Sequence, residues 1–170
     1  MLYASSQRHG CFLETLARFR VDLTLYAELS QIDGEDDFIP LGRVPRSWAA
    51  PRMLGSAQHE GEYADLYSSE WIAILRRELA ADCLELDLAD LDASALQRSI
   101  PRALTQRASR LVFRRKFDGI HYHSKYGHEI QNWALFEPFK ISLQDVAPID
   151  LADPELARAL AIHRLQIGPL

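Results

Sequence analysis

The chain begins with the stretch MLYASSQRHGCFLE, residues 1–14. This stretch predicts a short strand over residues 2–5, a polar turn over residues 6–10, and the start of an amphipathic helix. Tyr3, a polar aromatic residue, lies on the expected strand. Glu14, an acid, lies on the helix that follows this strand. The stretch therefore predicts a strand–turn–helix unit with two chemically capable side chains.

The composition is that of a globular protein. Of the 170 residues, 48% are hydrophobic and 25% are charged, which is typical of one folded domain with a sizeable core. The formal net charge of -5 argues against general binding of nucleic acid. Cys11 and Cys83 lie in apolar patterns and predict small core residues rather than a disulfide framework. This cysteine usage fits a reducing cytoplasm, which is the expected location. No apolar run reaches the ~18 residues of a spanning helix, so we expect no membrane contact.

Hydrophobic periodicity predicts a mixed α+β fold, with a small mixed sheet and flanking helices. Residues 21–32 fit either a helix or a strand, and we favour a short helix; the acidic run at residues 33–37 predicts a solvated loop. Ser68 or Ser69 and Asp153 are expected to cap helices. Helices are expected at residues 12–20, 21–32, 68–81, 101–115 and 154–164, and strands at residues 2–5, 83–88, 119–124, 133–137 and 139–146.

The second chemically rich stretch is FDGIHYHSKYGHEIQNWALFEP, residues 117–138. Successive side chains of a strand point to opposite faces of its sheet. One face would carry a ring and a hydroxyl, from Tyr122 and Ser124. The other would carry two imidazoles, from His121 and His123. The stretch therefore predicts two faces with different chemistry.

Two alternative chemistries use this stretch. A metal site would draw on His121, His123 and His128, but apart from Glu129 no carboxylate or cysteine stands at a supporting spacing, and we expect these histidines to be solvated or hydrogen-bonded. A hydrolase would need Ser124 as nucleophile with a histidine as base, but no G-x-S-x-G elbow surrounds it. Rossmann and P-loop patterns are absent from the sequence.

Two segments resemble the signatures of the RES domain family. The first is LYASSQRHGCFLETLARF, which is similar to the family's L-Y-x-A-S strand and the helix that follows it; its step from Tyr3 to Glu14 is similar to the step between the family's active-site Tyr and Glu. The second is FDGIHYHSKYGHEIQNWALFE, which is similar to D-G-I-x-Y-x-S followed by N-x-A-L-F. Between them, RALTQRAS resembles a helix that usually precedes the second signature. The resemblance covers roughly residues 2–137.

The resemblance implies an α+β fold related to ADP-ribosyltransferase toxins. It also implies a toxin of a bacterial toxin–antitoxin pair that consumes NAD, splitting off nicotinamide with phosphate or water as the acceptor, or transferring ADP-ribose to a protein. NAD is then the substrate, and no metal is expected. The implied partner is a small helix-turn-helix antitoxin that covers the active site. A homo-oligomer is a further expectation, without direct contact with nucleic acid.

Three site residues follow from the resemblance. Tyr3 matches the aromatic residue that packs against the nicotinamide end, Glu14 the catalytic acid, and Ser124 the active-site hydroxyl. A fixed carboxylate suits this reaction because positive charge develops on the ribose as the nicotinamide bond breaks. An aromatic face suits the flat, cationic nicotinamide ring. Asn132 and Trp133 are expected to build the fold around the second signature.

The family also carries an arginine that no residue of this chain matches. It lies on a glycine-rich segment about ten residues before the Tyr, and a guanidinium there would anchor the dinucleotide phosphates. Only two residues precede Tyr3. We therefore expect residues 1–170 to be a single RES-like domain that is N-terminally incomplete. The alternative is a catalytically silent RES-fold binding module, and a histidine–metal hydrolase is less favoured.

Overall fold

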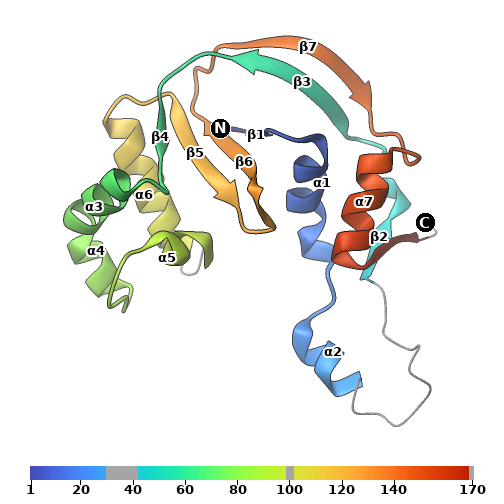
Figure 1. The fold of residues 1–170 in the computed structure, drawn as a ribbon, viewed down its shortest axis with the longest axis horizontal. Coiled ribbons are helices and arrows are strands. Elements are labelled where there is room, and N and C mark those ends of the chain that lie inside the picture. Colours follow the sequence, from blue (N-terminus) through green and yellow to red (C-terminus); the bar gives the residue numbers. More distant parts are fainter. Residues whose placement is uncertain (30–41, 99–101, 169–170) are drawn as a thin grey trace. The chain divides into compact units, whose positions relative to one another are not determined.

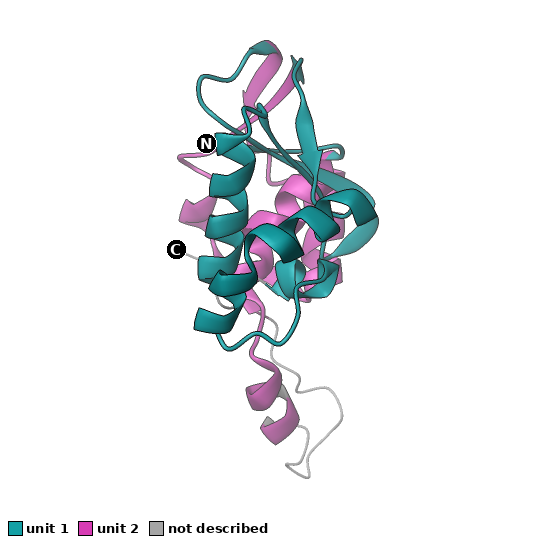
Figure 2. Cartoon of the chain, turned by 90° about the vertical axis from the view of Figure 1, so that its left-hand side faces the viewer, with its two compact units in different colours: residues 1–7, 58–142 teal, residues 8–57, 143–170 magenta. Residues whose placement is uncertain are grey.

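The structure is a computed structural model that describes residues 1–29, 42–98 and 102–168. It is a mixed α+β protein with small sheets and flanking helices, as the periodicity predicted. The chain divides into two compact units (Figure 2). Unit 1 comprises Met1–Gln7 and Gln58–Ser142, and unit 2 comprises Arg8–Ala57 and Leu143–Leu170. The single RES-like domain stays a prediction.

Unit 1 is built on a four-stranded sheet with the order β1-β6-β5-β4 (Figure 1). β1 and β5 pair antiparallel with β6, whereas β4 pairs parallel with β5. The strands are β1 (Leu2–Ser5), β4 (Tyr63–Asp65), β5 (Gly119–Ser124) and β6 (Gly127–Leu135). The predicted strands at residues 2–5 and 119–124 are therefore confirmed. The predicted start of the next strand at residue 133 is wrong, because a tight turn at residues 125 and 126 lets β6 begin at Gly127.

Four helices cover one face of this sheet (Figure 1). They are α3 (Ser69–Glu78), α4 (Ala80–Glu85), α5 (Ala93–Arg98) and α6 (Arg102–Arg114). The core of unit 1 lies between helices and sheet: Leu75 and Leu104 from the helices are fully buried with Ala64, Ile120 and Ala134 from the strands. The predicted helix at residues 101–115 is thus confirmed over Arg102–Arg114. No described helix is long and apolar enough to cross a membrane.

The predicted strand at residues 83–88 is wrong, because this segment begins within α4. Cys83 is buried and follows Leu79 at helical spacing, so both side chains enter the core from one side of the chain. Leu84 is 80% exposed, and Leu86 packs at the edge of the core. The alternation of apolar and acidic residues in CLELDL is too short to separate a strand from an amphipathic turn of helix.

Two predicted helix caps are confirmed. The Ser68 hydroxyl accepts a hydrogen bond of 3.2 Å from the backbone N–H of Trp71 at the start of α3. The Asp153 carboxylate accepts one of 2.9 Å from the N–H of Glu155 at the start of α7. Both side chains satisfy backbone donors that a helix leaves unpaired at its first turn.

Unit 2 centres on two helices that lie side by side, α1 (Arg8–Leu16) and α7 (Pro154–His163) (Figure 1). Phe12, Leu13 and Leu16 from α1 are buried together with Leu156 and Ala159 from α7. α1 begins at Arg8, earlier than expected, so the last residues of the predicted turn, 8–10, are already helical. The helix favoured at residues 21–32 is present as α2 (Leu23–Leu29). Residues 30–32 and the acidic loop at residues 33–37 lie outside the described residues.

Two further pairs of strands complete the fold. β2 (Gly42–Pro45) pairs parallel with β8 (Leu165–Gly168), and β3 (Met53–His59) forms a two-stranded sheet with β7 (Ile141–Pro148). β7 confirms the strand candidate at residues 139–146, shifted by two residues. The short 3₁₀ helices are η1 (Ala17–Phe19) and η2 (Arg46–Trp48).

Candidate functional site

Tyr3 lies on β1, an edge strand of the unit 1 sheet. In the strand register it stands opposite Ala134 of β6. Hydrogen bonding to β6 continues one residue beyond the strand, because the N–H of Ser6 donates to the carbonyl of Gln131 at 2.8 Å. Tyr3 is nevertheless 67% exposed. A fixed backbone with an exposed ring gives a surface on which a flat ligand can stack.

Ser124 ends β5 and is buried. Its hydroxyl oxygen accepts a hydrogen bond of 3.1 Å from the backbone N–H of Tyr126. Ser124 stands opposite Gly127 in the register, so this bond spans the tight turn between β5 and β6. The side chain therefore has a structural task in the hairpin, whatever else its hydroxyl contacts.

Tyr3 and Ser124 belong to the same sheet but do not lie against each other. Tyr3 is opposite Ala134, which in turn is opposite Ile120 of β5. Ser124 follows Ile120 by four residues. With about 3.3 Å per residue along a strand and about 4.8 Å between strands, the two Cα atoms are roughly 16 Å apart. A ligand that touches both side chains must therefore be extended.

Glu14 lies on α1 in unit 2 and is half-buried. Within this unit its carboxylate is close enough to His163 of α7 to favour the charged imidazolium. The imidazole Nε2 donates a hydrogen bond of 2.9 Å to the carbonyl of Leu13. Glu14 is thus fixed on a helix that is packed and hydrogen-bonded to its neighbour. Tyr3 and Ser124 belong to unit 1, so the three predicted residues are placed within their own units only.

His163 predicts a pH dependence for the stability of unit 2. Burial lowers the pKa of its imidazole below the ordinary value, and this outweighs the opposing hydrogen bond to Leu13 and the charge of Glu14. The unfolded chain therefore takes up a proton at a higher pH than the folded unit. The contribution of His163 to the free energy of unfolding is therefore fully present above the pKa of histidine in the unfolded chain, about 6.5. It falls as the pH drops below that value.

We expect the free energy of unfolding to fall between about pH 7.5 and about pH 5.5, and to fall less in His163→Gln. Glutamine retains an N–H that can reach the Leu13 carbonyl but does not titrate. Urea unfolding at a series of pH values measures the difference. His128→Gln, which changes a fully exposed imidazole, should keep the wild-type pH profile. Equal profiles for wild type and His163→Gln would contradict this assignment.

Aromatic and imidazole rings gather on the sheet face opposite the helices of unit 1. This ring cluster is a chain of edge-on and tilted contacts. Its centre is Trp133 of β6, which lies 5.2 Å from His121 and 5.6 Å from His59 between ring centroids. His121 is also 5.7 Å from His123. The cluster comprises His59, Tyr63, Tyr67, His121, His123 and Trp133.

The structure separates the three histidines that the sequence suggested as a metal site. His121 and His123 share one face of β5, as predicted. His128 contributes its backbone carbonyl, which accepts a hydrogen bond of 2.6 Å from Nδ1 of His123, while its own ring is 99% exposed beside Glu129. In the described ranges, no group of three His, Cys, Asp or Glu residues could hold a metal ion.

The start of the second signature has a structural explanation. Asp118 joins two segments: its carboxylate accepts from the N–H of Glu62 and its own N–H donates to the Glu62 carbonyl, both at 2.8 Å. Its carbonyl accepts from the N–H of Phe136, also at 2.8 Å. Asn132 is buried and stands in register between Ser5 and Tyr122. These contacts support the expectation that part of this signature builds the fold.

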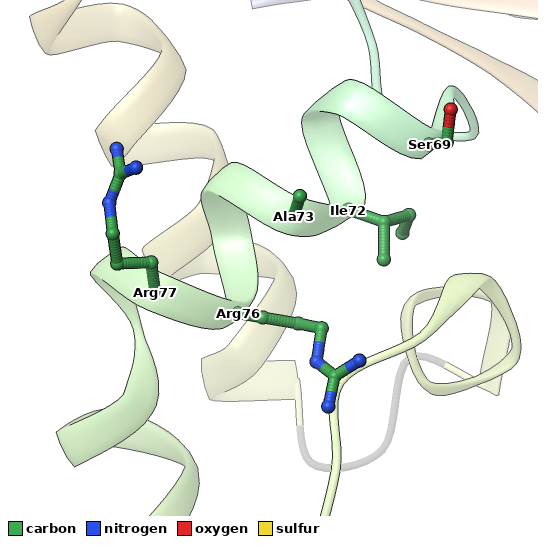
Figure 3. Close-up of a pocket in the computed structure, with 5 residues that line it drawn as sticks. All are labelled: Ser69, Ile72, Ala73, Arg76 and Arg77. Atoms are coloured by element: carbon green, nitrogen blue, oxygen red, sulfur yellow. The ribbon is translucent and has the colours of Figure 1, made fainter.

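A surface pocket of about 540 Å³ lies on α3 (Figure 3). The guanidinium groups of Arg76 and Arg77 point to different sides of the helix in this view. Arg76 forms an ion pair with Asp90 at 3.1 Å, and Arg77 one with Glu78 at 3.0 Å. The lining residues are Ser69, Ile72, Ala73, Arg76 and Arg77. None of the three predicted site residues lines this pocket, and its two cations are already paired.

Two basic residues at α6, Arg107 within it and Arg115 just after it, also pair with acids. Arg107 contacts the carboxylates of Asp82 at 2.6 Å and Glu85 at 2.9 Å, and Arg115 contacts Glu78 at 3.1 Å. These ion pairs connect α6 to α4 through Arg107, and they connect Arg115 to α3. They form a surface network of ion pairs.

Tyr3, Glu14 and Ser124 stay the predicted site residues, each placed within its own unit. No protein-family model matches the chain, and no curated protein or solved structure matches it either. Membership of the RES family therefore stays a prediction that is based on the residues that carry the resemblance.

Proposed function

We propose that this chain is a RES-like toxin that degrades NAD by cleaving the bond between nicotinamide and ribose. Glu14 acts on the ribose as the catalytic acid, Tyr3 stacks on the nicotinamide ring, and Ser124 offers its hydroxyl to the ligand. The ADP-ribose goes to phosphate, to water or to a protein. A helix-turn-helix antitoxin is the proposed partner, and the cytoplasm the proposed location.

One observation carries this proposal: the first signature folds as an edge strand with an exposed Tyr3, followed directly by a helix with a half-buried Glu14. An exposed ring on a fixed strand is available to a cationic heteroaromatic group. A half-buried carboxylate interacts more strongly with a developing charge than an exposed one, because less water screens it. The exposure of Tyr3 and the partial burial of Glu14 support these proposed roles.

The reaction balances with these groups alone. The bond from the ribose carbon to the nicotinamide nitrogen breaks, and the electron pair leaves with nicotinamide, which becomes neutral. The ribose carbon acquires oxocarbenium character, which the Glu14 carboxylate stabilises electrostatically. An oxygen of the acceptor then forms a bond to this carbon, and an acceptor that carries a proton loses it. The scheme uses no metal ion.

A second candidate function, a catalytically silent RES-fold binding module, has its own supporting observation. Ser124 is buried, and its hydroxyl already accepts the N–H of Tyr126 in the hairpin turn. In this reading Ser124 belongs to the fold, and the roughly 16 Å from its Cα to that of Tyr3 reflects two unrelated positions in a sheet. The two candidates differ in whether NAD is consumed.

Incubation with NAD tests the proposal. We expect the purified chain to release nicotinamide, and Glu14→Gln to lower the rate by about 100-fold or more, because the substitution removes the charge that stabilises the transition state. Chromatography of the nucleotide products measures the rate. Comparing buffers with and without inorganic phosphate identifies the acceptor.

Glu28→Gln provides the matched control, because Glu28 is an exposed acid on another helix of the same unit. Its rate should equal that of the wild type. Intact NAD after prolonged incubation with the wild type would favour the silent module. A rate that is equal in wild type and Glu14→Gln would remove Glu14 from the mechanism.

A further inference from the structure

We propose that His121 and His123 form a two-imidazole site for a divalent transition-metal ion such as Zn²⁺, Ni²⁺ or Cu²⁺. Both side chains lie on the face of β5 that carries the ring cluster. In the strand register Tyr3 lies on the other face, level with Ala134 and Ile120. The site is therefore independent of the NAD chemistry proposed above, and no step of that reaction depends on it.

The surroundings of His123 determine which of its ring nitrogens is available. Nδ1 lies 2.6 Å from the carbonyl oxygen of His128. A carbonyl oxygen can only accept, so Nδ1 carries the proton, and Nε2 of the neutral ring carries the lone pair. Histidines that bind metals have this arrangement, in which the other ring nitrogen donates to a carbonyl or a carboxylate.

His121 has a carboxylate near the same ring nitrogen, at a distance longer than a hydrogen bond. Its Nδ1 lies 3.6 Å from Oδ1 of Asp65 on the neighbouring strand β4. The negative charge favours a proton on Nδ1, which again leaves the lone pair on Nε2. That Nε2 atom is buried and has no hydrogen-bond partner within the part of the chain that the structure describes. A buried polar atom without a partner is costly, and a bound ion removes the cost.

The spacing of the two rings fits one shared ion. His121 and His123 are two residues apart on one strand, and their ring centroids lie 5.7 Å apart at an angle of 64°. Because a zinc–imidazole bond is about 2.0–2.1 Å long, two rings that share an ion have centroids within roughly 6.4 Å. No third protein ligand joins them among the described residues. Water therefore fills the remaining positions, and the ion exchanges more readily than in a structural zinc site.

Calorimetric titration of the metal-free chain, without a purification tag, tests the proposal. Titration with Zn²⁺ or Ni²⁺ should show one ion bound per chain. His121→Gln and His123→Gln should each weaken binding by about tenfold or more, because each removes one of two protein ligands. His128→Gln is the matched control: it removes an exposed imidazole but keeps the backbone carbonyl that holds His123. Its affinity should equal that of the wild type.

A second measurement needs no variant and so does not depend on variants that fold. Adding Cu²⁺ to the wild type should broaden the NMR signals of the Tyr122 amide and the Trp133 indole N–H first. Absence of binding at about millimolar metal, loss of binding in His128→Gln, or broadening centred on Glu129 would each overturn the proposal. These readouts do not involve NAD, so they separate failure of this proposal from failure of the proposed enzyme activity.

Discussion

Leu75→Ala is expected to lower the free energy of unfolding by about 3 kcal/mol, whereas the same substitution at Leu84 should change it by less than about 0.5 kcal/mol. Leu75 is fully buried on α3, at the centre of the unit 1 core. Truncating it removes apolar contacts and leaves a cavity that the surrounding helices fill only in part. Leu84 is 80% exposed on the adjacent helix α4, so little burial is lost there.

Urea unfolding followed by far-ultraviolet circular dichroism measures both variants. The comparison is well matched because the same side chain is shortened in neighbouring helices of one unit. A large loss of stability in Leu84→Ala would mean that residues 83–88 bury alternate side chains, as a strand does. A small loss in Leu75→Ala would mean that the α3 side of the core repacks around the missing atoms.

The elements that the sequence predicted well are those whose signals are local. The helix α7 has a capping aspartate, a proline in its first turn and an apolar face, all within residues 153–163. β5 places Ile120 and Tyr122 on the face towards the core, and the two histidines between and after them on the other face. Each of these signals comes from a few neighbouring residues. It can therefore be recognised without knowing which other segments the element contacts. The same holds for the cap at Ser68.

The elements that were missed depend on distant partners. β4 is three residues long and becomes a strand by pairing with β5, which lies more than fifty residues further along the chain. β2 and β8 have four residues each, and they pair with each other although more than one hundred residues separate them along the chain. No local periodicity exists in such short segments. The opposite error arose at residues 83–88, where a local alternation was outweighed by burial of Cys83 on a helix.

The candidate site shows the same difference between local signals and long-range pairing. The sequence placed Tyr3 on a strand and Glu14 on the helix that follows it, and both placements are confirmed. It could not show that Tyr3 is exposed or that Ser124 is buried, because both depend on which strand forms the edge of the sheet and on the hairpin turn. Asp65 was also missed, because only the parallel pairing of β4 with β5 brings it to His121.

Gly119→Ala is expected to be as damaging as the core truncation, at about 3 kcal/mol. No described glycine has a positive φ, so the requirement at Gly119 is space. A Cβ atom there would collide with the backbone carbonyl of Ala134 on β6 and lie 3.1 Å from the Tyr63 ring. A backbone carbonyl in a paired sheet moves only if the pairing of β5 and β6 opens.

Gly55→Ala is the control for this prediction, because a Cβ at Gly55 would meet its nearest atom, the carbonyl oxygen of Asp145, at 3.3 Å on an exposed strand. The free energy of unfolding of Gly55→Ala should stay within about 1 kcal/mol of the wild-type value. Alanine lowers the conformational entropy of the unfolded chain, and this gain in stability offsets the tight contact. Thermal and urea unfolding of both variants measure the contrast. Equal stability of the two would mean that β5 and β6 can separate at little cost, and that the glycine of the D-G-I segment is not required by the fold. A large loss at Gly119 alone assigns this glycine to the architecture of the sheet, which leaves the function of the signature to its polar side chains.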